Sequence, residues 1–177
     1  VFTEADERFW VGVGVTRSER FIVIGSESKM SSEYWLLDAD SPASDLSVIE
    51  PRREGHEYRI SHQGNRLLIL TNDNAVDFRL METPVHDAGY TNWEELIPHR
   101  AGVRLEDVDV FETFMVVTER RQGIPVMRVL DHEEGSEFEI EMSEPIFEAG
   151  PGANAEYSTR AFRYGYTSMV TPPSPYE

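Results

Sequence analysis

Polar and apolar positions follow a pattern that recurs four times along the chain. Short strand-like segments cover residues 20–24, 66–70, 113–117 and 160–164, so their starts lie 46 or 47 residues apart. β-Branched and aromatic residues are frequent in these segments, and turn residues separate them from their neighbours, which favours strands over helices. A repeat of this length in an all-β chain is typical of the blades of a β-propeller.

Each full repeat predicts four antiparallel strands joined by turns that are rich in Gly, Asn, Asp and Ser. The expected strands of the first three repeats cover residues 8–15, 20–26, 33–39, 46–50, 56–62, 65–71, 76–82, 94–97, 103–111, 113–118, 125–131 and 136–142. The fourth repeat is expected to begin near Pro145 and to break off inside its third strand.

The predicted fold class is all-β, a partial β-propeller of about three and a half four-stranded antiparallel blades. The repeats span about residues 5–52, 53–100, 101–144 and 145–177 of a single domain that covers residues 1–177.

The faces of the predicted strands differ between the middle and the end of a repeat. The second strands, such as residues 67–70 and 114–117, are apolar on both faces, whereas a two-layer sandwich exposes one face of each sheet. The last strand of the third repeat, residues 137–142, alternates acidic and apolar side chains, as an outer edge strand does. This difference favours a propeller over an immunoglobulin-like sandwich, which stays the structural alternative.

The composition narrows the classes of function. The 177 residues include 16 basic and 33 acidic side chains, a formal net charge of −17. This charge argues against a nucleic-acid partner and favours cationic partners such as basic peptides, although an acidic surface also serves solubility alone. Cysteine is absent, which excludes disulfides, thiolate catalysis and Cys-based zinc sites. No apolar run approaches the roughly 18 residues of a membrane span, so no membrane partner is expected, and the lack of a signal-like leader favours the cytoplasm.

Motifs for catalysis or metal binding are missing from the sequence. No serine lies in a Gly-x-Ser-x-Gly setting, and no histidine pair has the His-Glu-x-x-His spacing of zinc peptidases. His56 and His62 share one face of a predicted strand but lie about 20 Å apart, so we expect each to line a channel or the surface. No catalytic, cofactor-binding or metal-binding residue is therefore assigned, and no cofactor is expected.

Two other motifs have simpler interpretations. Gly12 and Gly14 lie inside a predicted strand without the third glycine and the following helix of a dinucleotide site. We expect them to relieve crowding where inner strands converge. Asp38 and Asp40 begin like a calcium loop, but Ile49 stands where such a loop needs a glutamate, so a turn is expected instead.

An ordered set of segments resembles the propeller of the prolyl oligopeptidase family, and within it the oligopeptidase B (protease II) group. The shorter segments are residues 31–39, 51–53, 56–58 and 65–67. The longest read WEELIPHR at residues 93–100 and RYGYTSMVTP at residues 163–172. Together they follow the family's order over nearly the whole chain.

The resemblance implies a seven-bladed propeller that caps an α/β-hydrolase domain with a Ser-Asp-His triad. Members of the family cleave short peptides, the oligopeptidase B group after Arg or Lys, and the propeller filters substrates by size. The triad follows the propeller in the family and none of it falls in this chain, so the chain alone is expected to be inactive. The implied partners are the catalytic domain of the same parent chain and short basic peptides.

Two further expectations accompany this resemblance. A non-catalytic propeller that serves as a protein-binding module stays an alternative, because the fold alone does not fix a function. An unclosed set of blades also exposes two faces that neighbouring blades normally cover, so we expect the chain to self-associate through those faces.

Overall fold

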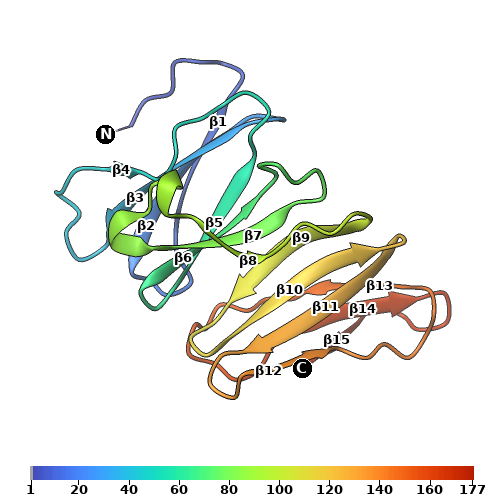
Figure 1. Ribbon diagram of the computed structural model, residues 1–177. Helices are drawn as coiled ribbons and strands as arrows, with labels where there is room; N and C mark the ends of the chain where they lie inside the picture. Colours follow the sequence, from blue (N-terminus) through green and yellow to red (C-terminus); the bar gives the residue numbers. More distant parts are fainter. Residues whose placement is uncertain (1) are drawn as a thin grey trace.

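The computed structural model describes residues 2–177 as four antiparallel β-sheets that follow one another along the chain (Figure 1). Within each sheet the strands are hydrogen-bonded in sequence order. Sheet 1 contains β1 (Trp10–Val15), β2 (Phe21–Glu27), β3 (Ser32–Asp38) and β4 (Ser47–Val48). Sheet 2 contains β5 (Tyr58–Gln63), β6 (Arg66–Thr71), β7 (Arg79–Pro84) and β8 (Glu94–Ile97). Sheet 3 contains β9 (Val103–Val110), β10 (Phe114–Arg121), β11 (Ile124–Asp131) and β12 (Ser136–Glu139). Sheet 4 contains β13 (Phe147–Pro151), β14 (Tyr164–Ser168) and β15 (Ser174–Tyr176).

The all-β fold class is confirmed, and the strands of the first three sheets lie close to their predicted places. Strand β8 has the predicted bounds, whereas β10 runs three residues beyond the predicted end to Arg121. The reason is the turn that follows, in which Gln122 and Gly123 both have positive φ. Such a two-residue turn keeps the ladder intact up to the pair Arg121 and Ile124. Two short 3₁₀ turns, η1 (Val85–Asp87) and η2 (Tyr90–Asn92), lie between β7 and β8.

The prediction is wrong for the fourth strand-like segment. Residues 160–164 are predicted to form the second strand of the fourth repeat, but the strand found there, β14, begins only at Tyr164. The residues before it belong to a long loop, in which the N–H of Arg163 donates to Asn154 Oδ1 at 2.8 Å. Phe162 is buried and lies edge-on to the ring of Phe111 in sheet 3. The apolar side chain at this position therefore reflects packing of the loop on sheet 3, not a strand.

The hydrophobic core lies between consecutive sheets. In β6, Leu67 and Ile69 pack with residues of sheet 1, whereas Leu68 and Leu70 pack with residues of sheet 3. Strand β10 is covered on both sides in the same way, with Met115 and Val117 toward sheet 2 and Phe114 and Val116 toward sheet 4. These strands are apolar on both faces because each face belongs to a different core. This arrangement is that of propeller blades and differs from a two-layer sandwich.

The two end sheets each have a face that residues 2–177 leave largely uncovered, so the four sheets do not close into a ring over this part of the chain (Figure 1). The outer face of sheet 1 is mostly apolar; Ser26 and Glu33 also lie on it and are bonded to Glu4 and Arg52. Its cross-strand register places these side chains on that face: Val11, Val13, Val15, Ile22, Ile24, Trp35, Leu37 and Val48.

The outer face of sheet 4 is different, because small and polar residues occupy it. The residues on that face are Glu148, Gly150, Gly165, Thr167 and Pro175. Apolar surface is predicted for both ends of the array, but it is concentrated on sheet 1.

Tyr58 holds the joint between sheets 1 and 2. Its side chain is only 1% exposed, donates to the carbonyl of Glu50 at 2.7 Å and accepts the N–H of Tyr34 at 3.0 Å. The hydroxyl of Ser32 bonds both the N–H and the carbonyl of Tyr58, at 2.6 and 2.7 Å. Tyr58, Tyr34 and Ser32 belong to segments that carry the family resemblance, and their packing at a joint between sheets accounts for these residues.

Candidate functional site

A hollow of about 910 Å³ runs beside the first strands of sheets 1, 2 and 3. All six residues of β1 line it, together with Ile60–His62 of β5 and with Val108 and Val110 of β9. In a propeller the first strands surround the central channel. The hollow therefore corresponds to the channel side of these sheets, and we take it as the candidate functional site.

Glycine forms much of the wall that sheet 1 contributes to this hollow. A Cβ atom added to Gly12 or to Gly14 would meet nothing within 4 Å, so the expectation that these glycines relieve crowding is wrong. Crowding occurs instead at Gly25 on the neighbouring strand, where an added Cβ would lie 2.8 Å from the Tyr34 ring. The glycines of β1 thus leave open space beside a strand, and only Gly25 makes room for a packed side chain.

The two ends of the hollow carry different polar groups. Trp10, Glu27 and Tyr34 line it at the end where β1 begins, and the Tyr34 hydroxyl donates to Glu27 Oε1. Burial and this hydrogen bond both raise the pKa of Tyr34, which keeps the hydroxyl a donor at neutral pH. Arg17 and His62 line the opposite end. A ligand that lay along β1 would therefore meet a carboxylate at one end and an arginine at the other.

Arg17 joins sheet 1 to sheet 3 at its end of the hollow. Its guanidinium donates to Asp109 Oδ1 at 2.5 Å and to the carbonyl of Val110 at 3.0 Å, and it lies 4.5 Å from the centre of the Phe111 ring. Burial raises the pKa of the Asp109 carboxyl above its ordinary value, although the guanidinium opposes this shift. The charge of Arg17 is therefore matched by Asp109, which leaves Glu27 as the carboxylate lining the hollow.

The structure separates the two histidines that the sequence places on one strand. His62 lines the hollow, and its Nδ1 lies 2.7 Å from the hydroxyl of Ser18, so it is a channel-side residue as expected. His56 precedes β5 and is buried beside Tyr58 and Trp93, so the expectation of a channel or surface position is wrong for it. Burial lowers the pKa of both imidazoles, which favours their neutral forms.

The turns at this end of the hollow bind the four sheets to one another. The Gln63 side chain donates to the carbonyl of Phe111 at 2.7 Å, which joins sheet 2 to sheet 3. Tyr157, in the loop before β14, accepts the N–H of Gly64 at its hydroxyl, at 3.1 Å, and the N–H of Glu112 at its carbonyl, at 2.9 Å. One rim of the candidate site is thus a continuous polar network across all four sheets.

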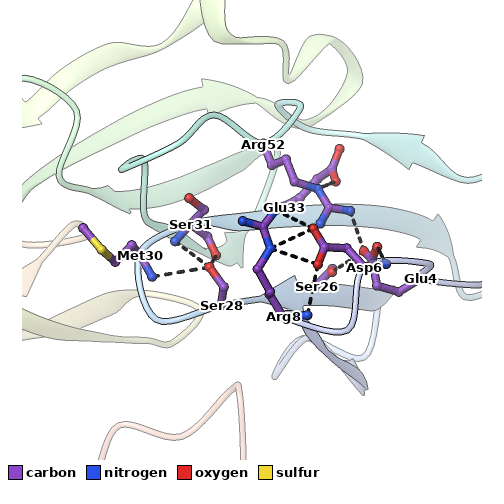
Figure 2. Close-up of polar contacts among 9 residues, drawn as sticks. All are labelled: Glu4, Asp6, Arg8, Ser26, Ser28, Met30, Ser31, Glu33 and Arg52. Carbon is purple, nitrogen blue, oxygen red and sulfur yellow. Dashed lines mark hydrogen bonds and ion pairs between the residues drawn. The ribbon is translucent and has the colours of Figure 1, made fainter.

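A second polar cluster fastens the N-terminal segment to sheet 1 (Figure 2). Arg52 bonds Glu4 and also donates to Glu33 at 2.9 Å, and its guanidinium lies 4.0 Å from the Phe9 ring centre. The hydroxyl of Ser26 also donates to Glu4, at 2.8 Å. The N–H of Asp6, with Arg52 and Ser26, lowers the pKa of Glu4 to about 2. All these groups satisfy one another, so the cluster is an anchor for residues 2–9 and offers no free group for chemistry.

Residues 2–177 contain no group of three or more His, Asp or Glu side chains placed to hold a metal ion. None of the helical segments in this range is long and apolar enough to cross a membrane.

The sequence assigned no site residue. It missed Trp10, Arg17 and Glu27, whose positions around the hollow depend on contacts between sheets; the Gly-Val-Gly of β1 was the one local indication.

Comparison with known proteins places this geometry in a family. Residues 1–177 match the family model described as "Prolyl oligopeptidase, N-terminal beta-propeller domain". Dipeptidyl aminopeptidase BI of Pseudoxanthomonas mexicana is 35% identical over the full chain, which covers 24% of that relative, and Protease 2 of Moraxella lacunata is 28% identical over 97% of the chain and 24% of its own length. The solved structure of oligopeptidase B from Trypanosoma brucei superposes with a TM-score of 0.90 at 31% identity, over 99% of this chain and 26% of that one.

The stacked antiparallel sheets and the hollow beside their first strands define a partial β-propeller. The chain belongs to the prolyl oligopeptidase family, as part of its N-terminal β-propeller domain. It spans about a quarter of the length of the relatives that it matches.

Replacing Arg17 with methionine tests the link between sheets 1 and 3. We expect the free energy of unfolding to fall by about 2–3 kcal/mol at pH 7, because a largely buried carboxylate at Asp109 loses its counter-charge. Since the folded-state pKa of Asp109 lies above its unfolded value, ionisation weakens the fold; this loss is absent below the unfolded pKa and complete above the folded pKa. The deficit of the variant should therefore shrink as the pH falls from 7 toward about 4, measured by urea unfolding.

The matched control is Arg160→Met, because the Arg160 side chain is 73% exposed and pairs with Glu133 at the surface. This variant should change stability by less than about 0.5 kcal/mol. A deficit of Arg17→Met that equals the control, or that does not change with pH, would contradict the role given to the pair.

Proposed function

We propose that this chain supplies the substrate-filtering propeller of a serine peptidase that hydrolyses short peptides after Arg or Lys. Support comes from the family, from the resemblance to oligopeptidase B, and above all from the hollow beside the inner strands of an acidic chain. The proposed partner is a catalytic α/β-hydrolase domain of the same polypeptide, which would carry the nucleophilic serine. In this role the propeller does no chemistry: it admits extended peptides, excludes folded proteins and steers cationic chains.

The charge distribution supports the steering part of this role. The chain carries a net charge of −17; Arg17, which lines the hollow, is paired with Asp109, and Arg59 of β5 lies 3.9 Å from Asp107. Glu27 lines the hollow and forms no ion pair among residues 2–177; it accepts the neutral hydroxyl of Tyr34, whose pKa is raised by burial against a smaller opposing effect of the Arg59 charge. A negative field of this kind raises the local concentration of basic peptides.

Salt dependence of catalysis tests this steering in the full-length protein that carries the chain. Between about 0.01 and 0.15 M salt the Debye length falls from roughly 30 Å to 8 Å, so long-range attraction is largely screened. We expect kcat/KM for a short Arg peptide to fall severalfold over this range, and kcat/KM for the same peptide with a neutral residue in place of Arg to change little.

Steady-state rates with both peptides, each offered with a blocked and with a free N-terminus, provide the measurement. The free N-terminus matters because one relative is named a dipeptidyl aminopeptidase. An equal response of the charged and neutral peptides to salt would rule out steering, and failure to cleave any of them would rule out the proposed activity.

We also propose that two copies of the isolated chain associate through the outer face of sheet 1. Apolar side chains dominate this face, and those at its inner edge are well exposed, Val13 at 76% and Val15 at 58%. Contiguous apolar surface of this kind is rarely left open on a soluble monomer. An isologous contact would bury the same face of both copies at once.

Light scattering of the purified chain should show a dimer that dissociates on dilution. Val13→Asp should abolish it, because the substitution places a charge in the middle of the outer face. Val76→Asp is the matched control, because Val76 is 78% exposed but lies outside the strands, between β6 and β7. A wild-type chain that stays monomeric at high concentration, or equal effects of the two substitutions, would refute this contact.

A further inference from the structure

The free edge of β1 has the properties of a strand-addition site for a peptide. Within residues 2–177, β1 pairs with β2 alone, and all six of its residues line the hollow. All six are also exposed. An edge strand that faces an open cavity offers its main chain to an extended ligand.

The hydrogen-bond pattern shows which groups are free. The N–H of Thr16 donates to the carbonyl of Phe21 at 2.9 Å, so these two residues form a hydrogen-bonded pair of the ladder. Such pairs alternate along an antiparallel ladder, and the next ones are Gly14 with Val23, and Gly12 with Gly25. The N–H and C=O groups of the residues between them, Val11, Val13 and Val15, therefore point away from β2 and toward the hollow.

The space beside this edge fits a peptide backbone with side chains. In an added strand the residues opposite Gly12 and Gly14 would project over the same side of sheet 1 as those glycines. Neither glycine has a side chain to compete for that space, and an added Cβ would meet nothing within 4 Å there. Bulky ligand side chains can therefore lie over Gly12 and Gly14 without meeting a side chain of β1.

Charge selects the kind of peptide. Glu27 is on β2 opposite Trp10, on the same side of sheet 1 as the glycines. It lies two strand spacings, about 10 Å, from an added strand, a distance that an arginine or lysine side chain and the glutamate can bridge across Gly12. Its carboxylate already accepts the Tyr34 hydroxyl and keeps a second oxygen available.

We propose that an extended peptide with basic side chains binds in the hollow by pairing with the free edge of β1, with Glu27 holding one of its cations. This inference rests on the proposed function for the view that the ligand is a peptide substrate. It adds a binding mode and named groups: main-chain bonds to Val11, Val13 and Val15 give affinity without regard to sequence, and Glu27 gives the preference for basic side chains.

Binding of synthetic peptides to the purified chain tests the proposal without any peptidase activity. The probe is a fluorescent, end-blocked six-residue peptide with arginine at its second and fourth positions, followed by anisotropy. A second probe has every other amide N-methylated on the pairing edge, and a third has glutamate in place of arginine. We expect the unmethylated basic peptide to bind at least about tenfold more tightly than either of the others.

Two variants of the chain make the test specific to β1. Val13→Pro removes one free N–H without touching the ladder to β2, and proline is tolerated on edge strands. It should weaken the basic peptide at least about tenfold, whereas Val13→Ala, which keeps the N–H, should change binding less than about threefold. Thermal unfolding of both variants checks that they are folded. If Val13→Pro does not fold, the methylated probe on the wild-type chain still tests whether main-chain hydrogen bonds hold the peptide.

The outcomes separate this inference from the proposed function. Equal binding of the methylated peptide, or no binding of the basic one, overturns strand addition even if the full-length protein cleaves Arg peptides. Binding with the expected preferences supports the β1 site even if the full-length protein cleaves none of them, in which case the proposed peptidase activity alone fails.

Discussion

The two middle sheets of this protein depend on being covered from two sides. The second strands β6 and β10 carry large apolar residues on both faces, and each face is completely buried only because a neighbouring sheet packs against it. A fully buried leucine or methionine stabilises the fold by roughly 1.5–3 kcal/mol relative to an exposed one, so a sheet without its neighbours would lose most of its stabilisation. The stacking of consecutive sheets follows from this single requirement.

Within residues 2–177, the same requirement leaves the inner edge of each of the first three sheets unpaired. Stacking uses the faces of the sheets, so the unpaired main-chain edges of β1, β5 and β9 can line a channel, although side chains of β5 and β9 such as Tyr58 and Val110 belong to the cores. Polar contacts between turns, such as Arg17 with Asp109 and Gln63 with Phe111, then fix the distances between these edges. Only β1, whose residues are all exposed, can vary without cost to a core, because Tyr58 of β5 and Leu105 of β9 are buried core residues.

The strands and turns that depend only on residues close together in the sequence are predicted correctly. Strands β6 and β10 were found from their continuous apolar runs, and the turn at Gln122 and Gly123 from its residues. Strand β14 was misplaced because the burial of Phe162 comes from a loop that packs on another sheet, which no pattern within residues 160–164 reveals. Longer-range features stayed hidden for the same reason, including the link from Arg17 to Asp109, 92 residues away, and the hollow that several sheets enclose.

Amide hydrogen exchange, resolved strand by strand, tests the dependence on two-sided cover most directly. Exchange from a core strand reports the free energy of opening it. The account predicts that the amides of β6 and β10 exchange most slowly and those of β2, which is covered on one face, faster. Strand β1, which is exposed throughout, should be the least protected strand of the first three sheets. Protection of β1 and β2 as strong as that of β6 in the dilute monomeric chain would contradict the account.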